Sequence, residues 1–142
     1  DLGDESTNTK RLAIIRKFTS MARHPELFAE KPNWTCNEWL DPGFSKALAA
    51  GTADAWRDLL MTHSPGEVYS FPFFTAGFCE VLLQEVMNFY DSGLPARRPN
   101  SMNNYGIILA EIGLEPWVRS LQDLVRPLGE LLWPGPGSGW DG

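Results

Sequence analysis

Among the 142 residues, the pair with the most suggestive chemistry is His24 with Glu26. A metal site made of two histidines and one carboxylate commonly takes two ligands from positions i and i+2 of a strand. His24-Pro25-Glu26 has that spacing, but it follows a helical pattern, and no apolar strand pattern surrounds it. The context therefore favours a histidine-proline turn that ends a helix over a metal site.

The other residue types with catalytic potential are not arranged for a recognisable reaction. A nucleophilic serine or cysteine needs a nearby histidine, and both His24 and His63 lie in unrelated stretches. His63 is predicted to lie at the C-terminal end of a helix, where the dipole favours it. Cys36 and Cys79 lack activating neighbours, and we interpret both as reduced structural thiols. We therefore expect no catalytic residue and no metal ligand within this chain.

The run Met102-Asn103-Asn104-Tyr105-Gly106 is unusual in composition. Adjacent asparagines before a glycine indicate backbone positions with unusual torsion angles, or amides directed at a ligand. Composition favours a turn that leads into a strand at residues 105–109, and the ligand interpretation stays open.

The composition is that of one folded domain, with 43% hydrophobic and 21% charged residues. A formal net charge of −6 argues against a surface that binds nucleic acid. No apolar run reaches 18 residues, so no membrane span is expected. The chain starts with Asp1 and has no charged-then-apolar leader, so we interpret it as a fragment or a processed chain. Its cellular location is unknown from the sequence, with the cytoplasm or nucleus favoured.

Hydrophobic periodicity predicts five helices and two strands. The expected helices cover residues 9–23, 44–50, 53–63, 76–90 and 116–133, and the expected strands cover residues 68–74 and 105–109. Residues 1–6 are expected to fray. Thr52 and Thr75 are the expected N-caps, and Gly51 and Gly93 are the expected helix ends.

Aromatic residues and prolines give further expectations about these segments. Residues 26–43 are irregular but hold Phe28, Trp34 and Trp39, which predicts a segment pressed on a surface. Pro72 limits the first strand to an edge or ends it there. Pro127 lies inside the last helix and is predicted to kink it. Two exposed strands are marginal alone, so further strands are expected elsewhere.

Several segments resemble the prolyl/lysyl-hydroxylase-type (PKHD-type) dioxygenases. Residues 65–74 (PGEVYSFPFF) and 78–83 (FCEVLL) resemble the opening of these enzymes. Residues 98–106 (RPNSMNNYG), followed by 111–114 (EIGL), are similar to the RPN-x-MN-x-YG segment of a plant and algal branch and its animal counterparts. Upstream, residues 23–28 and 39–42 also look like the helical leader of that branch.

The resemblance implies an α+β fold, namely a helix-rich N-terminal region with the leading strands of a double-stranded β-helix (jelly roll). The core of that jelly roll is expected to be missing from this chain. The implied boundaries are a helical leader in residues 1–64, the N-terminal part of the dioxygenase domain in residues 65–134 and a Gly/Pro linker in residues 135–142. The family's metal-binding His-x-Asp, its distal histidine and its basic residue for 2-oxoglutarate would all follow Gly142.

The resemblance also implies a function for the full-length protein. That protein is expected to use iron(II), 2-oxoglutarate and, as a further option, ascorbate to hydroxylate a protein substrate, whereas this chain alone is inactive and binds none of them. The residues that the resemblance places near the substrate entrance are Arg98, Asn100, Met102, Asn103, Asn104 and Tyr105. A structural role, in which these amides only fix the loop against the barrel, stays open. So does another class of function, a non-catalytic scaffold or assembly subunit that retains only this leader as an interaction module.

Overall fold

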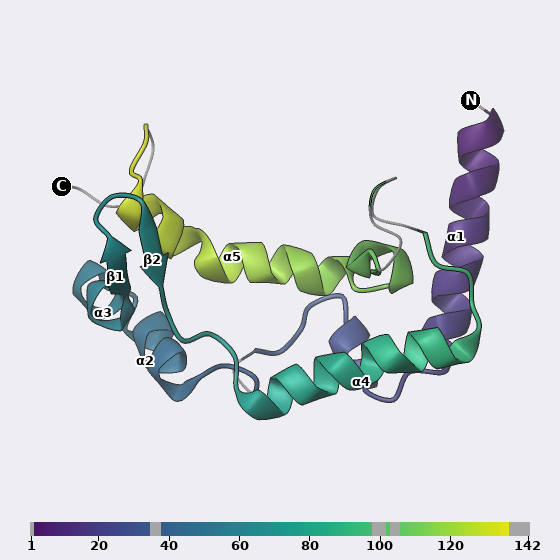
Figure 1. Cartoon of the computed structure of the whole chain (residues 1–142), viewed down its shortest axis with the longest axis horizontal. Helices are drawn as coiled ribbons and strands as arrows, with labels where there is room; N and C mark the ends of the chain where they lie inside the picture. Colours follow the sequence, from purple (N-terminus) through teal and green to yellow (C-terminus); the bar gives the residue numbers. More distant parts are fainter. Residues whose placement is uncertain (1, 35–37, 98–101, 103–105, 137–142) are drawn as a thin grey trace. The chain divides into compact units, whose positions relative to one another are not determined.

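A computed structural model of the chain describes residues 2–34, 38–97, 102 and 106–136 (Figure 1). The elements in these residues are α1 (Leu2–Ser20), η1 (Pro25–Phe28), α2 (Pro42–Ala50), α3 (Ala53–Leu59), β1 (Met61–Ser64), β2 (Val68–Ser70), α4 (Ala76–Ser92), η2 (Leu109–Ile112) and α5 (Glu115–Leu132). They form a helix-rich arrangement with one small antiparallel sheet, which agrees with the predicted α+β class. The chain divides into a first unit, Asp1–Pro32 with Glu80–Ser120, and a second unit, Asn33–Cys79 with Leu121–Gly142.

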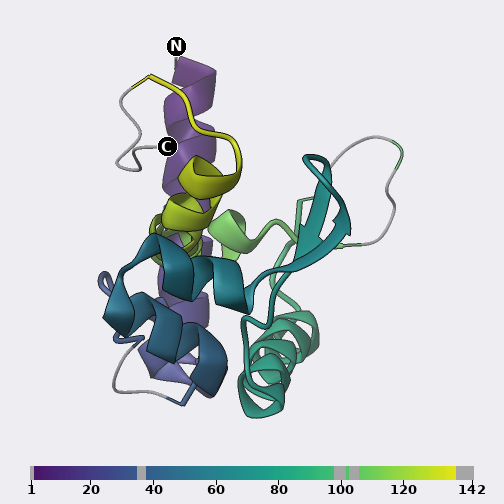
Figure 2. The same cartoon turned by 90° about the vertical axis from the view of Figure 1, so that its left-hand side faces the viewer.

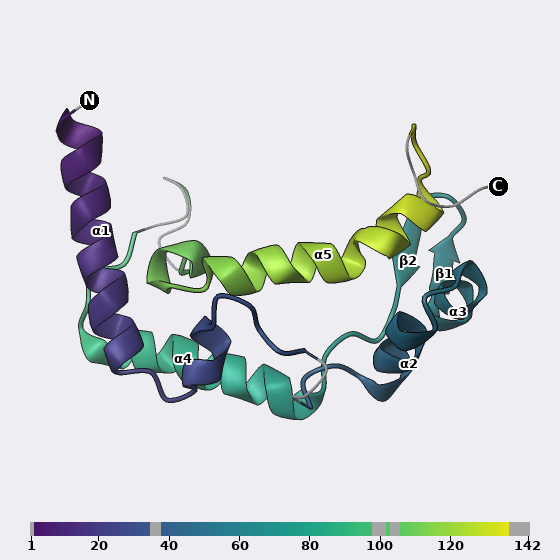
Figure 3. The ribbon, with the colours of Figure 1, turned by 180° about the vertical axis from the view of Figure 1, so that it is seen from behind.

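The core of the first unit forms around Phe18, at the end of α1. Its ring meets Phe89 of α4 edge-on at a centroid distance of 5.0 Å, and it meets Phe28 of η1 at 5.7 Å. Figure 3 shows the end of α1 meeting the end of α4 at this place. Phe18, Leu27 and Phe89 are all buried. The histidine-proline turn thus lets the chain fold back and bring η1 onto α1.

Stacked aromatic rings fill the second unit. The Phe44 ring lies 4.7 Å from that of Phe73 and 5.3 Å from that of Trp56, between centroids. Trp34 and Trp39 meet edge-on at 5.4 Å, and both are buried. Both rings also contact that of Phe78 in α4, at centroid distances of 6.0 Å from Trp34 and 5.1 Å from Trp39, which confirms the prediction that the irregular segment is pressed on a surface at these two tryptophans.

The two short helices of the second unit lie side by side and lead into a β-hairpin (Figure 2). The side chain of Asp41 caps α2 by accepting from Gly43 N at 2.8 Å, and Gly51 ends the helix with φ +65°. Thr52 Oγ1 accepts from Ala55 N at 3.2 Å and caps α3, as the sequence predicts. Each cap satisfies a backbone donor that the first turn of a helix leaves unpaired.

The prediction of a helix over residues 53–63 is wrong in its last part. Leu60 takes an extended conformation (ψ 139°), and Met61 to Ser64 form β1, which pairs with β2. Cross-strand hydrogen bonds with Val68–Ser70 outweigh the local helical pattern here. His63 is therefore a strand residue, and its Nε2 lies 2.7 Å from Ser70 Oγ.

The two predicted strands are shorter than expected or absent. β2 ends at Ser70 rather than at residue 74, because Pro72 has no N–H to donate to a ladder. Phe74 forms only an isolated bridge with Leu40. The strand expected at residues 105–109 is wrong in its described part, since residues 106–108 are irregular and η2 begins at Leu109. The glycine at 106, with φ +117°, does not favour an extended strand there.

The remaining predicted helices are present, and the largest difference is in α1, which covers Leu2–Ser20 rather than residues 9–23. α1 begins at Leu2, so the predicted fraying of residues 1–6 is wrong for residues 2–6. Phe78 N donates to Thr75 Oγ1 at 3.1 Å, which confirms the cap of α4, and Gly93 follows the helix with φ +73°. α5 runs through Pro127, and its axis changes direction toward the C-terminal end in Figure 3. None of the helices in the described residues has the length and apolarity to cross a membrane.

Gly113 is predicted to be intolerant of a side chain. It has φ +102°, and a Cβ there would lie 3.2 Å from Ile15 Cγ2 and 3.2 Å from Thr19 Cγ2. We expect Gly113→Ala to lower the free energy of unfolding by about 1–3 kcal/mol, because backbone strain adds to the close contacts. Urea denaturation measures the change.

Gly129, within α5, provides the matched control, because a Cβ there would meet no atom within 4 Å. Gly129→Ala is expected to raise the free energy of unfolding by about 0.5–1 kcal/mol through helix propensity. Equal effects of the two substitutions would contradict the steric account of Gly113.

Candidate functional site

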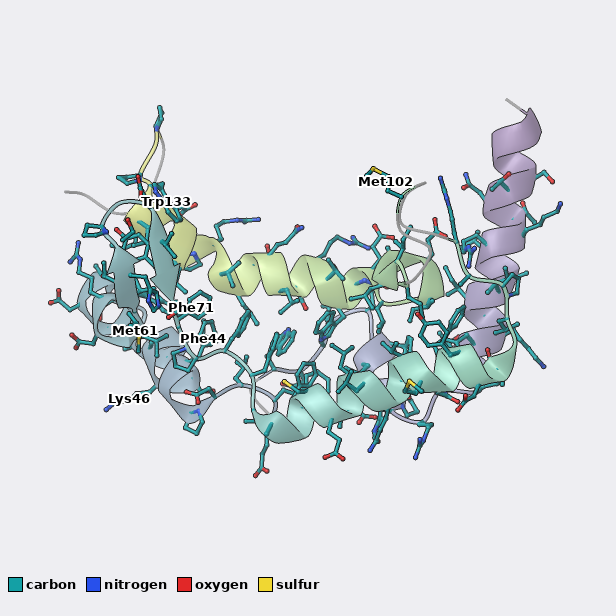
Figure 4. The ribbon with its side chains drawn as sticks, viewed as in Figure 1. Phe44, Lys46, Met61, Phe71, Met102 and Trp133 are labelled. Atoms are coloured by element: carbon teal, nitrogen blue, oxygen red, sulfur yellow. The ribbon has the colours of Figure 1, made fainter. Side chains whose placement is uncertain are left out.

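The residues that the sequence places at a substrate entrance belong to residues 98–105, between two segments of the first unit that the structure describes. Arg98, Asn100, Asn103, Asn104 and Tyr105 are outside the described residues, so their arrangement stays a prediction. Met102 is described, and 92% of its surface is exposed. Figure 4 shows its side chain pointing away from the ribbon. We therefore describe the site from its two flanking segments, residues 94–97 and 106–112, which we name the stems.

One arginine of α1 connects the two stems. Arg11 Nη1 donates to the carbonyl oxygen of Pro95 at 3.3 Å and to that of Glu111 at 3.2 Å. Its Nη2 lies 3.3 Å from Glu111 Oε2. The planar guanidinium group can contact both stems at once, because its N–H groups point in fixed, diverging directions.

Glu111 also forms an ion pair across the loop. Its Oε1 accepts from Arg97 Nη1 at 3.2 Å. The side chains of Arg11 and Glu111 are only 22% and 20% exposed, whereas that of Arg97 is 70% exposed. Partial burial strengthens the inner ion pair, and water screens the outer one. We name Arg11, Arg97 and Glu111 the stem cluster.

The stem cluster was not found by sequence reasoning. Glu111 lies within the family-like segment at residues 111–114, and nothing in the sequence pattern singles out Arg11. Their contact joins residues one hundred positions apart. A single sequence holds no signal for such a long-range pair, so only the fold reveals it.

The possible metal pair, His24 and Glu26, has a structural role in the first unit. His24 N donates to the carboxylate of Glu85, and His24 Nε2 lies 2.7 Å from Gln84 Oε1. His24 Nδ1 is 3.7 Å from Glu26 Oε1. His24 also occupies the N-cap position of η1, with Pro25 at its start. The prediction that this turn ends the first helix is wrong in its position, because α1 already ends at Ser20 and His24-Pro25 instead begins η1.

Glu85 is a buried acidic residue of α4 that the sequence analysis did not single out. It has no exposed surface. Asn88 Nδ2 donates to its Oε2 at 3.3 Å and to the carbonyl oxygen of Met21 at 3.1 Å. The carboxylate thus connects α4 to the turn after α1. An acidic residue inside the apolar pattern Leu82 to Phe89 was the signal that could have identified it.

The other candidate ligands and nucleophiles have local surroundings of their own. His63 contacts Ser70 in the hairpin of the second unit. Cys79 is a free thiol at the surface, so the expectation that it packs as a structural residue is wrong. Cys36 lies outside the described residues. Within the part of the chain that the structure describes, no three histidine, cysteine or acidic side chains are arranged to hold a metal ion. These residues do not fit an iron site.

Comparisons with known proteins agree on one family. The family model described as the OGFOD2-like domain matches residues 14–138. The human "2-oxoglutarate and iron-dependent oxygenase domain-containing protein 2" is 47% identical over 74 residues, which are 51% of this chain and 21% of that protein. The Xenopus tropicalis protein of the same name is 33% identical over 143 residues, covering 97% of this chain and 39% of that protein.

A plant protein is similar over almost the same length. The Arabidopsis thaliana "2-oxoglutarate and iron-dependent oxygenase domain-containing protein ICU11" is 28% identical over 138 residues, covering 91% of this chain and 34% of that protein. The chain therefore spans between 21% and 39% of the length of these relatives. No solved structure matches it.

The contacts of Arg11 in the stem cluster allow a prediction about the stability of the variant that lacks this side chain. We expect Arg11→Met to lower the free energy of unfolding by about 1–3 kcal/mol, because two carbonyl groups lose their donor and a partly buried carboxylate loses an ion-pair partner. Amide hydrogen exchange in residues 94–97 and 106–112 should become faster. Arg119→Met is the control, because its ion pair with Glu115 is exposed and 3.8 Å long. It is expected to change stability by less than about 0.5 kcal/mol, and similar losses in both variants would refute the role of Arg11.

Because Glu85 is buried, we expect its substitution to lower the free energy of unfolding. Glu85→Ala removes the acceptor for His24 N and Asn88 Nδ2 and leaves a cavity, so we expect a loss of about 2–4 kcal/mol of unfolding free energy. Glu80→Ala, at an exposed position of the same helix, is expected to stay within about 0.5 kcal/mol. Urea denaturation compares the two variants. A small effect of Glu85→Ala would show that the buried carboxylate does not hold the turn.

Proposed function

The chain belongs to the OGFOD2-like domain family, and from this premise we propose that the full-length protein is an iron(II)- and 2-oxoglutarate-dependent oxygenase that hydroxylates a protein side chain. The observation that carries the proposal is the family match over residues 14–138. The names of its animal and plant relatives specify an oxygenase domain that depends on 2-oxoglutarate and iron. The RPN-x-MN-x-YG segment supports a finer placement in the PKHD-type branch that includes plant and algal proteins.

In this proposal, iron and 2-oxoglutarate bind to residues outside the 142 residues. The described histidines are used elsewhere, since His24 contacts Gln84 and His63 contacts Ser70. When bound, the iron supplies the activation of oxygen, and ascorbate is a proposed additional requirement. We keep the proposed boundaries of a leader in residues 1–64, a dioxygenase portion in residues 65–134 and a linker in residues 135–142.

We propose that this chain contributes to the reaction by positioning residues 98–105, which we name the entrance loop. The stem cluster fixes both ends of the segment that carries Arg98, Asn100, Met102, Asn103, Asn104 and Tyr105. Fixed stems limit the conformations that the loop must lose when a substrate binds, which favours affinity. A protein substrate is proposed from the resemblance to prolyl and lysyl hydroxylases.

One observation favours a second candidate, a scaffold or assembly subunit. Three large apolar side chains, Leu83, Met87 and Tyr90, are at least half exposed on α4. Exposed apolar groups that share one side of a helix mark an interaction surface more often than an enzyme active site. The two candidates differ in whether the full-length protein consumes 2-oxoglutarate.

Turnover of 2-oxoglutarate tests the proposal directly. The full-length protein is incubated with iron(II), 2-oxoglutarate and ascorbate, and succinate is measured. We expect succinate to form only with iron(II), and the 142-residue chain to form none. A full-length sequence without a His-x-Asp after Gly142, together with no succinate, would favour the scaffold.

Calorimetric titration of the 142-residue chain with manganese(II) tests where the metal ligands lie. We expect no tight site, because His24, Glu26 and Glu85 are engaged with one another and with backbone groups. His24→Ala is the control variant. Tight binding that this substitution abolishes would show that ligands lie within the chain.

A further inference from the structure

The outer face of α4 carries a row of apolar side chains within the first unit. Leu83, Met87 and Tyr90 are 63%, 55% and 50% exposed. They are separated by four and three residues, so they lie along one side of the helix. Glu85 and Phe89, on the opposite side, are buried. We name Leu83, Met87 and Tyr90 the α4 stripe.

The α4 stripe has the properties of a surface that binds a partner. A single exposed leucine is ordinary in a folded protein. Three large apolar side chains at helical spacing form a continuous ridge, and such a ridge is recognised by another helix through contacts at positions i, i+4 and i+7. The opposite face of α4, with Glu85 and Phe89, is the one that packs in the core of the first unit.

The charges of α4 indicate which partner fits. Ala76–Ser92 contains no lysine or arginine. Glu80 and Asp91 are exposed, one toward each end of the stripe. A complementary ligand therefore needs positive charge at both ends of its apolar ridge.

The same charges disfavour a second copy of this chain. In an antiparallel pair of α4 helices Glu80 would meet Asp91, and in a parallel pair each carboxylate would meet its equivalent. Like charges placed opposite one another cost free energy.

We propose that the α4 stripe binds a helix of another protein, one that carries an apolar ridge with lysine or arginine at each end. Leu83, Met87 and Tyr90 make the apolar contacts, and Glu80 and Asp91 pair with the basic ends. This binding does not depend on oxygenase chemistry, so it can be tested whether or not the full-length protein consumes 2-oxoglutarate.

Fluorescence anisotropy with two synthetic helical peptides tests the proposal. Both peptides carry leucines at the spacing of the stripe, and their ends carry lysine in one and glutamate in the other. We expect the full-length protein to bind the lysine peptide at least about tenfold more tightly than the glutamate peptide. Leu83→Gln and Met87→Gln should each weaken binding of the lysine peptide by about tenfold.

Charge reversal tests the role of the acidic ends. Glu80→Lys with Asp91→Lys should reverse the preference between the peptides. Glu30→Lys with Asp58→Lys makes the same change of charge at exposed positions outside α4 and should preserve the preference. Circular dichroism checks the helical content of every variant. Equal affinity for both peptides, or no effect of Leu83→Gln in a folded variant, would overturn the proposal.

Oxidative footprinting distinguishes the possible occupants of the stripe. In the full-length protein alone, Met87 and Tyr90 should be labelled, and the lysine peptide should protect them. Protection without peptide at every protein concentration would show that another part of the same chain covers the stripe. Protection that increases with protein concentration would show a second copy. Either result would overturn the proposal.

Discussion

The ion pair of Arg11 and Glu111 joins α1 to a segment one hundred residues later, and the positions of residues 94–97 and 106–112 depend on this contact. A loop gains a defined shape only if its ends are fixed, because each free residue has conformational entropy to lose. Arg11 fixes both stems through two backbone carbonyl groups and one carboxylate. An exposed surface pair would contribute little to this, but both partners here are about four-fifths buried.

Glu85 supplies a second polar connection in the same unit. A buried carboxylate is tolerated only where donors surround it, and here His24 N and the amide of Asn88 provide them. Because His24 N is held by Glu85, the chain turns at His24-Pro25 and returns η1 to α1. The aromatic contact of Phe18 with Phe28 then follows from that turn. The hydrogen bond from His24 N to Glu85 and the ring contact of Phe18 with Phe28 therefore depend on the same turn of the chain.

The sequence predicts the features that depend on neighbouring residues. Thr52 and Thr75 cap their helices, and Gly51 ends α2, because capping needs only residues within one helical turn. The helix boundary at Leu59 was missed, because pairing of Met61–Ser64 with Val68–Ser70 overrides the local pattern. The expected strand near Leu109 was also wrong, since Gly106 and η2 take its place.

The candidate site was only partly predictable, because some of its contacts join residues that are far apart in the sequence. The family-like run from Arg98 to Gly106 identifies the oxygenase family by residue type, whereas the groups that hold its stems come from α1 and η2. His24 and Glu26 have the spacing of metal ligands, yet their polar atoms face Gln84, Glu85 and one another. Residue spacing in a sequence says which chemistry is possible, and hydrogen-bond partners decide whether a side chain remains available for it. In the described residues, the polar groups of His24 and of the stem cluster contact backbone and side-chain groups that hold the fold together.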